Sequence, residues 1–316
     1  MSIASAVASL WIRARIKRKP AGEEALVRFT RRVFATPEWA VRLHSRKVKV
    51  EETHEPVKGE WVQPHDGAKA SHVIYYLHGG GYVSGSAKGY RPITATLARH
   101  LKARSFALDY RLAPESRFPA ALDDALAGYR WLISTGIEPR VISIVGDSAG
   151  GGLAIALAMK LRDSGEPLPS SIVSLSPWTD MAGTGDSILA NAKRDPFFVP
   201  EDVERYAHLY LGDQSRQTPF ASPLYGDFAG LPRLLIHAGE NEMLLDDARK
   251  VHAKAIAAGV ASELRIFKDV PHVWHLMTPF VPEARVALRE VAEFISRSGG
   301  LQTADLKEGG LESAPP

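Results

Sequence analysis

The chain has 316 residues, of which 45% are hydrophobic and 24% are charged, so it can bury a large core and is expected to be globular rather than disordered or collagen-like. It contains no cysteine, which excludes disulfides, thiolate metal sites and a cysteine nucleophile. The 39 lysines and arginines exceed the 36 aspartates and glutamates by a net charge of +3, which is too small to indicate a nucleic-acid-binding protein.

Residues 1–45 have a helical pattern and precede the first predicted strand. Their apolar stretch, residues 3–12, is followed by a basic run at 13–19, the reverse of the order in a secretory signal. We interpret the basic run as a solvated helix face rather than a contact with a polyanion or a membrane. No stretch approaches the ~20 apolar residues that span a bilayer, so we expect a soluble, cytoplasmic protein without stable membrane insertion.

Short β-branched or aliphatic runs alternate with longer helical patterns from residue 72 to residue 267. This alternation predicts an α/β fold in which helices cover both faces of a mostly parallel sheet. Eight strands are predicted, at residues 47–52, 59–63, 72–77, 105–109, 141–146, 171–176, 232–237 and 263–267. Helices with apolar residues at three- and four-residue intervals are predicted at residues 90–101, 118–134, 149–164, 246–258 and 283–296.

Two stretches do not fit the alternation and are expected to form a helical cap over the carboxyl ends of the strands. They are residues 1–45 and an insertion at residues 182–226, which separates two strands by more than a crossover requires. The core then comprises residues 46–181 and 227–298. Residues 299–316 are almost devoid of apolar side chains, so we predict a disordered tail there.

A G-x-S-x-G motif, GDSAG at residues 146–150, lies between a predicted strand and a predicted helix. The strand must turn sharply into the helix, so Ser148 should project from a helix N-terminus, where the helix dipole favours developing negative charge. The alternatives are a helix N-cap serine and a phosphate-binding loop, although the loop lacks the Gly-Lys-Ser/Thr ending and the G-x-G-x-x-G spacing. The strand and helix on either side favour a nucleophile.

The sequence HGGG at residues 78–81 follows the predicted strand at 72–77. Three consecutive glycines expose backbone N–H groups that no side chain shields, and such groups can donate to an oxyanion. A flexible turn is the alternative. Together with the serine motif, the loop predicts an acyl-transfer site.

A serine nucleophile needs a histidine base, and the histidine needs a carboxylate that fixes its tautomer. In α/β-hydrolases the acid and then the histidine follow the serine, on loops after later strands. After residues 263–267, His272 is preferred to His275 because it lies just beyond the strand, in a loop opened by a proline. After residues 232–237, the acids at 246 and 247 open a helix, so Glu240 and Glu242 remain candidates for the acid.

Three motifs, HGGG at 78–81, DYRLAPE at 109–115 and GDSAGG at 146–151, give a family resemblance. Over about residues 40–297 the chain resembles the hormone-sensitive lipase-like esterases, whose fold is an α/β-hydrolase sheet with a helical cap. The resemblance implies Ser148 as nucleophile and His272 as base. The family's acid position opens a carboxylate-x-Leu-x-Asp pattern, which begins here at Glu242, although Asp is the usual residue there.

The resemblance also implies the surroundings of the reaction. The oxyanion hole falls at Gly79, Gly80, Gly81 and Ala149, with Gly79 shaping the loop and the backbone amides of the other three as donors. The charged residues of the 109–115 segment are interpreted as structural support for this loop. Substrate-binding side chains are expected from the aromatic residues near the strand ends and in the insertion, namely Tyr82, Trp178, Phe198 and Tyr206.

The expected function is hydrolysis of a small-molecule ester with a short acyl chain, about six carbons or fewer, through an acyl-enzyme and without a metal or organic cofactor. A lactone hydrolase or a small-molecule deacetylase of the same family is the alternative. A non-catalytic ligand receptor on the same fold is disfavoured because a histidine is present at the expected place. Many relatives dimerise through an edge strand, so a homodimer through residues 263–267 is a candidate assembly.

Overall fold

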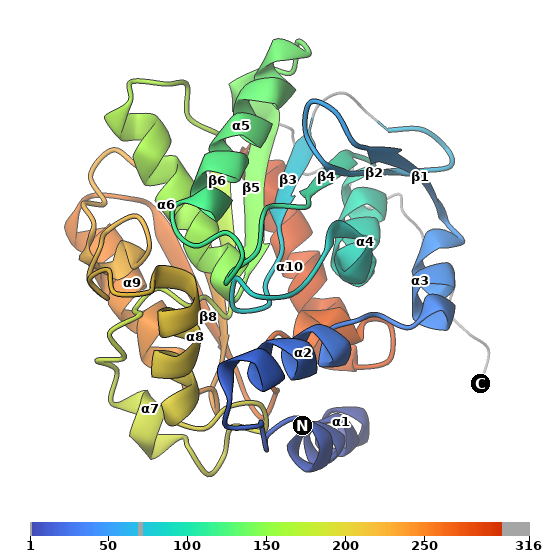
Figure 1. The fold of residues 1–316 in the computed structure, drawn as a ribbon. Coiled ribbons are helices and arrows are strands. Elements are labelled where there is room, and N and C mark those ends of the chain that lie inside the picture. Colours follow the sequence, from blue (N-terminus) through green and yellow to red (C-terminus); the bar gives the residue numbers. More distant parts are fainter. Residues whose placement is uncertain (1, 69–71, 299–316) are drawn as a thin grey trace.

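An eight-stranded sheet forms the centre of the computed structural model, which describes residues 2–68 and 72–298 (Figure 1). The tail at 299–316, predicted to be disordered, lies outside the described residues. The strand order is β1-β2-β4-β3-β5-β6-β7-β8; β2 is antiparallel to both of its neighbours, β1 and β4, and the other neighbouring pairs are parallel. The predicted α/β class and mostly parallel sheet are therefore confirmed.

The strands begin and end within two residues of their predicted positions. They are β1 (Val48–Thr53), β2 (Gly59–Pro64), β3 (Val73–Leu77), β4 (Arg104–Leu108), β5 (Ile142–Asp147), β6 (Ser171–Leu175), β7 (Arg233–Gly239) and β8 (Ser262–Phe267). Because β8 is the last strand in the order, its outer edge has no partner strand in the described chain.

The predicted helices correspond to α4 (Arg91–Leu101), α5 (Ala120–Ser134), α6 (Ala149–Asp163), α9 (Leu245–Ala257) and α10 (Pro282–Ser298). Outside them lie α1 (Ile3–Arg15), α2 (Glu23–Val33), α3 (Glu38–Ser45), α7 (Ser187–Ala190) and α8 (Glu201–Leu211). Short 3₁₀ turns are η1 (Ala87–Tyr90), η2 (Pro139–Val141), η3 (Pro223–Tyr225) and η4 (Trp274–Met277).

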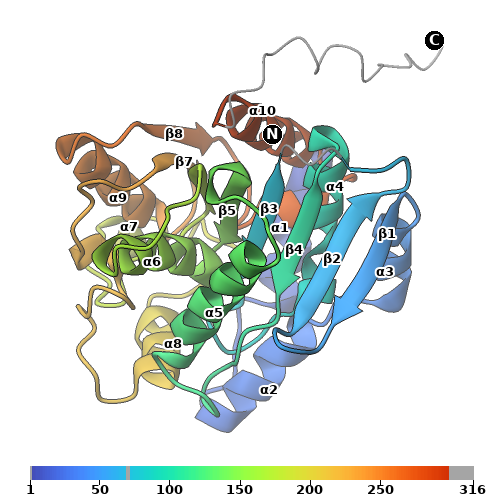
Figure 2. The ribbon, with the colours of Figure 1, turned by 90° about the horizontal axis from the view of Figure 1, so that it is seen from above.

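The core lies on both faces of the sheet, because successive residues of a strand point to opposite sides. Tyr75 and Leu77 of β3 pack in one cluster with α5, α6 and α9, whereas Ile74 and Tyr76 pack in another with α4 and α10. Figure 2 shows this layering along the sheet. Burial on both faces explains why every residue of the central strands β3, β5 and β6 is buried, and why apolar residues dominate them without a regular alternation with polar ones.

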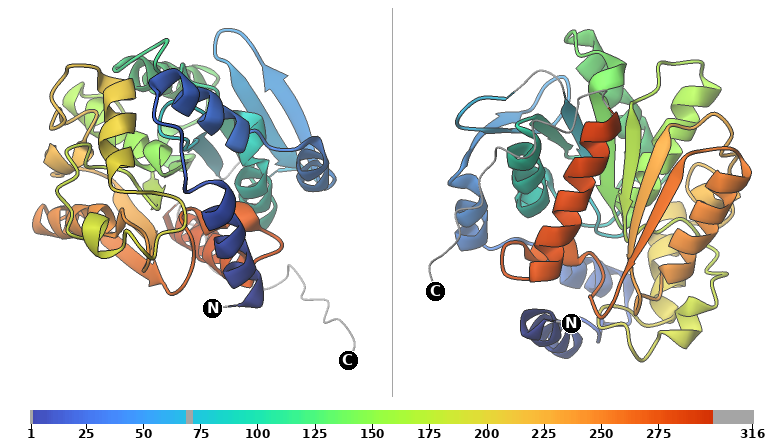
Figure 3. Two further views of the ribbon diagram at one scale, coloured as in Figure 1. Left: turned by 60° about the horizontal axis from the view of Figure 1, so that its bottom comes forward. Right: turned by 180° about the vertical axis from the view of Figure 1, so that it is seen from behind.

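Of the helices outside this three-layer arrangement, α1, α2, α7 and α8 lie on one side of the molecule, whereas α3 packs against α4 and β1. We call residues 2–45 and 182–226, which contain α1 to α3 and α7 to α8, the cap segments. Helices α1, α2 and α8 occupy the lower part of Figure 1, and the left view of Figure 3 shows them from that side. This is the side on which β5 and β7 end, where open α/β sheets bind their ligands.

Candidate active site

Ser148 lies in a sharp turn between β5 and α6. Its backbone has φ 50° and ψ −122°, a conformation that is strained for a residue with a side chain. Two glycines let the turn fit: a Cβ on Gly146 would overlap the Gly150 carbonyl, and a Cβ on Gly150 would overlap the Leu77 carbonyl. The turn presents Ser148 at the N-terminus of α6, where the helix dipole favours negative charge.

Three buried side chains from three loops form a hydrogen-bonded row. Ser148 Oγ lies 2.9 Å from His272 Nε2, and His272 Nδ1 lies 2.7 Å from Glu242 Oε2. Glu242 follows β7 and His272 follows β8, so adjacent parallel strands deliver both residues to the edge where β5 delivers the serine. The arrangement is that of a nucleophile, a base and an acid that orients the base.

The electrostatics of His272 suit the uptake of a proton. Burial by itself lowers the pKa of this imidazole, but the Glu242 carboxylate beside Nδ1, with smaller contributions from Asp195 and Asp147, outweighs burial and raises the pKa above its ordinary value. The charged imidazolium is therefore stabilised in place, which a general base requires when it accepts a proton during the reaction.

The other candidates for acid and base lie elsewhere. Glu240 is exposed, and the Asp246 carboxylate accepts the Ser187 amide at 2.8 Å and pairs with Arg249. His275 is buried behind the site, 3.2 Å from His237. Of the residues considered from the sequence, His272 and Glu242 are those that the fold places beside Ser148.

The glycine loop after β3 faces the same point. The structure records no acceptor for the amides of Gly80, Gly81 and Ala149 within the described chain, so these N–H groups are free to donate to a substrate oxygen. The Gly79 amide differs, because it donates to Asp147 Oδ1 at 2.9 Å. Gly79 therefore anchors the loop rather than donating to a substrate.

Asp147 is a site residue that the sequence analysis missed. Its carboxylate accepts Tyr76 Oη at 2.6 Å as well as the Gly79 amide, and so holds the glycine loop against the serine turn. Burial raises the pKa of Asp147 to about 7, although these hydrogen bonds oppose the rise. The sequence offered one indication of this role: Asp147 ends a strand that is buried throughout, and a buried carboxylate needs hydrogen-bond donors around it.

The 109–115 segment supports the other side of the loop. Tyr110 Oη donates to the His78 carbonyl at 2.6 Å, and the Ala113 amide donates to the Tyr82 carbonyl at 2.9 Å. The charged side chains point to partners outside the site: Arg111 pairs with Asp124, and Glu115 with the cap residue Arg31. None of these groups touches Ser148 or His272.

An apolar pocket of about 880 Å³, including the part open to solvent, lies over Ser148 and His272. Trp178, Phe198 and Tyr206, which were expected to bind substrate, are among the residues that line it. Aromatic and aliphatic side chains dominate the wall, including Phe34, Phe197, Leu276 and Met277. A pocket of this size and polarity suits an apolar group of a small molecule.

Tyr82 was expected in this wall, and the structure corrects that expectation. Its ring stacks on Tyr210 with centroids 3.8 Å apart and packs against Trp178, so the side chain fills the layer behind the pocket. The side chain is 1% exposed and lies outside the pocket lining within the described residues. The side chain of a residue that directly follows the glycine loop can point into the pocket or into the core, and no local pattern distinguishes the two.

Both cap segments contribute to the pocket wall. Ile16, Lys19, Thr30 and Phe34 come from the first segment, and Phe197, Phe198, Asp202, Val203 and Tyr206 come from the second. The segments are joined by Lys19, whose ammonium group donates to Asp202 Oδ2 at 2.7 Å and to the Phe197 carbonyl at 2.6 Å. Within residues 2–68 and 72–298, no group of three His, Asp or Glu side chains could hold a metal ion.

Comparison with known proteins places this site in a family. A family model described as alpha/beta hydrolase fold matches residues 74–276. An acetyl-hydrolase of Streptomyces hygroscopicus is 40% identical over 241 residues, which cover 76% of this chain and 80% of the relative.

Solved structures agree with this assignment. An esterase described as belonging to the bacterial hormone-sensitive lipase family is 41% identical, with a TM-score of 0.87 over 95% of this chain and 99% of that one. EstE5, in crystals soaked with p-nitrophenyl butyrate, is 38% identical, with a TM-score of 0.85 over the same shares of the two chains. The chain is therefore an esterase and belongs to the hormone-sensitive lipase-like family of α/β-hydrolases.

Proposed function

We propose that the protein is a serine carboxylesterase that hydrolyses small esters with short acyl chains through Ser148, His272 and Glu242. The observation that carries this proposal is the hydrogen-bonded row from Ser148 Oγ through His272 to Glu242, at 2.9 Å and 2.7 Å, beneath an apolar pocket. The free amides of Gly80, Gly81 and Ala149 supply the donors that a tetrahedral intermediate needs.

The reaction proceeds in two halves. His272 Nε2 takes the Ser148 proton while Oγ attacks the ester carbonyl carbon, and the three amides stabilise the resulting oxyanion. When the carbonyl re-forms, the bond to the alcohol oxygen breaks, His272 protonates the leaving alcohol, and the acyl group remains on Ser148. A water molecule then loses a proton to His272 and attacks the acyl carbon, and the acid leaves as Ser148 regains its proton. Glu242 stays ionised and stabilises the imidazolium.

Substitutions of the three residues test the mechanism. Ser148→Ala should lower kcat by roughly four to six orders of magnitude, because the nucleophile is gone. Glu242→Gln should lower kcat by about four orders, because a neutral amide neither fixes the tautomer nor stabilises the imidazolium. Both rates are measured with p-nitrophenyl acetate.

Matched controls come from the same loop and the adjoining helix. Glu240→Gln and Asp246→Asn make the same chemical change at carboxylates that lie away from His272, and both variants should keep most of the activity. A serine-directed phosphonate should label the wild type but not Ser148→Ala. Wild-type hydrolysis by Ser148→Ala, or equal losses of kcat in the Glu242, Glu240 and Asp246 variants, would contradict the proposed mechanism.

A small-molecule deacetylase or lactonase is the second candidate, and the relative named acetyl-hydrolase favours the deacetylase. The same residues and the same steps serve either substrate, because acetyl esters and lactones both present an ester carbonyl. Comparing kcat/KM for phenyl acetate and for γ-butyrolactone separates hydrolysis of an acetyl ester from hydrolysis of a lactone.

A further inference from the structure

The outward face of α1 is apolar. Four of its side chains are largely exposed: Ile3 at 85%, Val7 at 59%, Leu10 at 67% and Trp11 at 59%. Their spacing of three and four residues puts them in one stripe along the helix. The buried residues Ser5, Ile12 and Ile16 lie on the opposite side, against the body of the protein. We call these four exposed residues the α1 stripe.

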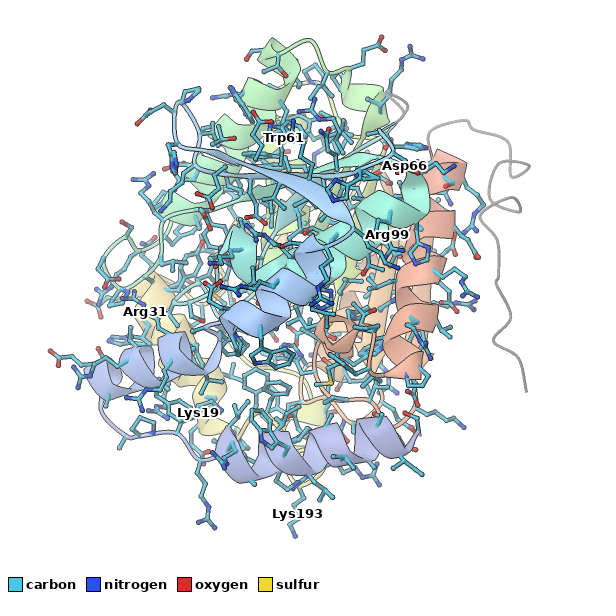
Figure 4. All side chains as sticks on the ribbon, turned by 90° about the vertical axis from the view of Figure 1, so that its right-hand side faces the viewer. Lys19, Arg31, Trp61, Asp66, Arg99 and Lys193 are labelled. Atoms are coloured by element: carbon cyan, nitrogen blue, oxygen red, sulfur yellow. The ribbon has the colours of Figure 1, made fainter. Side chains whose placement is uncertain are left out.

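Positive charge flanks the C-terminal end of the α1 stripe. Residues 2–20 contain no aspartate or glutamate, and Arg15 and Arg18 are exposed at the end of the stripe. Arg13 donates to the carbonyls of Lys193 and Arg194 at 2.8 Å each, which brings two more exposed cations beside the helix. Figure 4 shows Lys193 on the outer side of α1.

The carboxylates near α1 lie on its inner side. Glu240 and Asp269 line a groove together with Ser9, Arg13, Lys193 and Arg194. Ser9 lies on the side of the helix opposite Val7. Glu283 accepts the Ser2 amide and hydroxyl at 2.6 Å and 2.7 Å. These contacts hold the start of α1, and Lys17 holds its end through the Ala192 and Asp195 carbonyls. The α1 stripe is therefore presented by a helix that is fixed at both ends.

We propose that the α1 stripe docks on the surface of an anionic lipid bilayer, which revises the interpretation of the basic run at 13–19 as a merely solvated helix face, because the run lies next to four exposed apolar side chains. An exposed row of aliphatic side chains with a tryptophan, flanked by arginine and lysine, has the chemistry of a helix that lies in the membrane interface. A second copy of the chain fits less well, because pairing two such faces would bring together two acid-free, positively charged segments. In the described parts of the chain, no helix has the length and apolarity to cross a bilayer.

Docking in this way would bring the pocket close to the lipid. Ile16 and Lys19, which directly follow α1, line the pocket over Ser148. An apolar ester dissolved in the bilayer would then have a short path to the site. This consequence rests on the proposed function, whereas the docking itself does not.

Vesicle flotation with the full-length protein tests the proposal without any activity measurement. The wild type should float with vesicles of phosphatidylcholine and phosphatidylglycerol, should float much less with phosphatidylcholine alone, and should be released by high salt. Val7→Ser combined with Trp11→Ser removes apolar contact, and Arg15→Gln combined with Arg18→Gln removes charge. Each pair should weaken binding to the anionic vesicles by about tenfold or more.

Matched controls make the same changes away from α1. Trp39→Ser removes a tryptophan on α3 that is 64% exposed, and Lys47→Gln combined with Lys49→Gln removes two exposed cations near β1. Both controls should bind like the wild type, and circular dichroism verifies that every variant is folded. The proposal is overturned if the wild type does not float, if it floats equally without phosphatidylglycerol, or if the α1 variants float as well as the controls. A wild-type dimer that Val7→Ser and Trp11→Ser dissociate, without lipid binding, would assign the stripe to a second copy instead.

Discussion

Ser176 connects the loops of the candidate acid and the candidate base through a single hydroxyl group. Its Oγ donates to Glu242 Oε1 at 2.8 Å and accepts the Val273 amide at 3.2 Å, and the side chain is buried. The same Glu242 oxygen accepts the Gly239 amide at 2.5 Å. Ser176 has φ 47°, a left-handed backbone conformation that is strained for a residue with a side chain. We interpret Ser176 as a positioning residue that acts through Glu242.

Ser176→Ala should lower kcat for p-nitrophenyl acetate about tenfold with little change in KM, because Glu242 loses one of its charge-assisted hydrogen bonds. Without the hydrogen bond from Ser176, the negative charge of Glu242 is less compensated and should stabilise the His272 imidazolium more. The acid limb of kcat/KM against pH should therefore move to higher pH. Ser176→Gly also lacks the hydroxyl but relieves the positive φ. Equal losses in both variants support positioning, whereas wild-type rates in Ser176→Gly would assign the effect to the backbone.

The sequence identified the site residues that a local motif marks, and it missed those that depend on contacts between distant loops. Ser148 has its glycine motif, and chain order nominates His272. Chain order alone left Glu242 and Glu240 as candidates and the family resemblance favoured Glu242. The folded loop shows that Glu242 is buried and Glu240 is exposed. Ser176 has no motif at all, because its role is defined by two loops that follow β7 and β8.

At the scale of elements, the cap segments form a fixed wall over the pocket. Asp195 is buried, and its carboxylate accepts the amides of Phe197 and Phe198 at 2.7 Å and 3.1 Å and the Met243 amide at 2.8 Å. These bonds fasten the two phenylalanines to the loop that carries Glu242. The Phe198 ring meets the His272 ring edge-on, with centroids 5.0 Å apart. The wall therefore stands close to the reacting atoms and should limit the length of the acyl chain.

A series of p-nitrophenyl esters from acetate to palmitate should accordingly show maximal kcat/KM at six carbons or fewer. Phe198→Ala opens the wall beside His272 and should move the maximum to longer chains. Leu189→Ala also truncates a cap side chain, but Leu189 is 77% exposed, so this variant should keep the wild-type profile. A wild-type maximum at long chains, or the same profile in all three proteins, would contradict a wall that sets chain length.

The sheet was easier to predict than the cap segments, and the reason is physical. A buried parallel strand is a short, mainly apolar run between turn residues, so the local sequence is enough to locate it. Helix α8 carries an aromatic stripe at helical spacing, but Tyr206 faces the pocket while Tyr210 stacks on Tyr82 in the core. Periodicity identifies the buried side of such a helix, yet it does not say which part of that side meets a cavity.

For the whole molecule, buried titratable groups link stability to pH. His237 and His275 are fully buried beside each other, and Arg265 and Glu290 lie at the outer end of His237. Burial, and then the charge of Arg265, lower the pKa of His237 to about 3, and burial lowers that of His275 well below its ordinary value. Asp247 has the opposite shift, because burial raises its pKa to about 7 while it accepts the Thr179 and Asp180 amides.

These shifts act in opposite directions on the free energy of unfolding. Below about pH 6.5 the unfolded chain protonates its histidines while folded His237 stays neutral, so acid favours unfolding down to about pH 3. Between about pH 4 and 7 folded Asp247 keeps a proton that the unfolded chain loses, so acid there favours the folded state. The raised pKa of His272 matters only above about pH 6.5, because below that value both states are protonated.

Removing one group at a time should separate the two contributions. Between pH 6 and 4.5, the free energy of unfolding of His237→Phe should fall less steeply with decreasing pH than that of the wild type. The slope should differ by about 1.4 kcal/mol per pH unit, because the variant takes up one proton fewer on unfolding. Asp247→Asn should make the slope steeper by a similar amount. Urea unfolding at four pH values within this range measures the slopes, and packing losses change the intercept without changing the slope. Equal slopes for the wild type and His237→Phe would show that His237 is already protonated in the folded protein, so that His237 would not contribute to acid sensitivity.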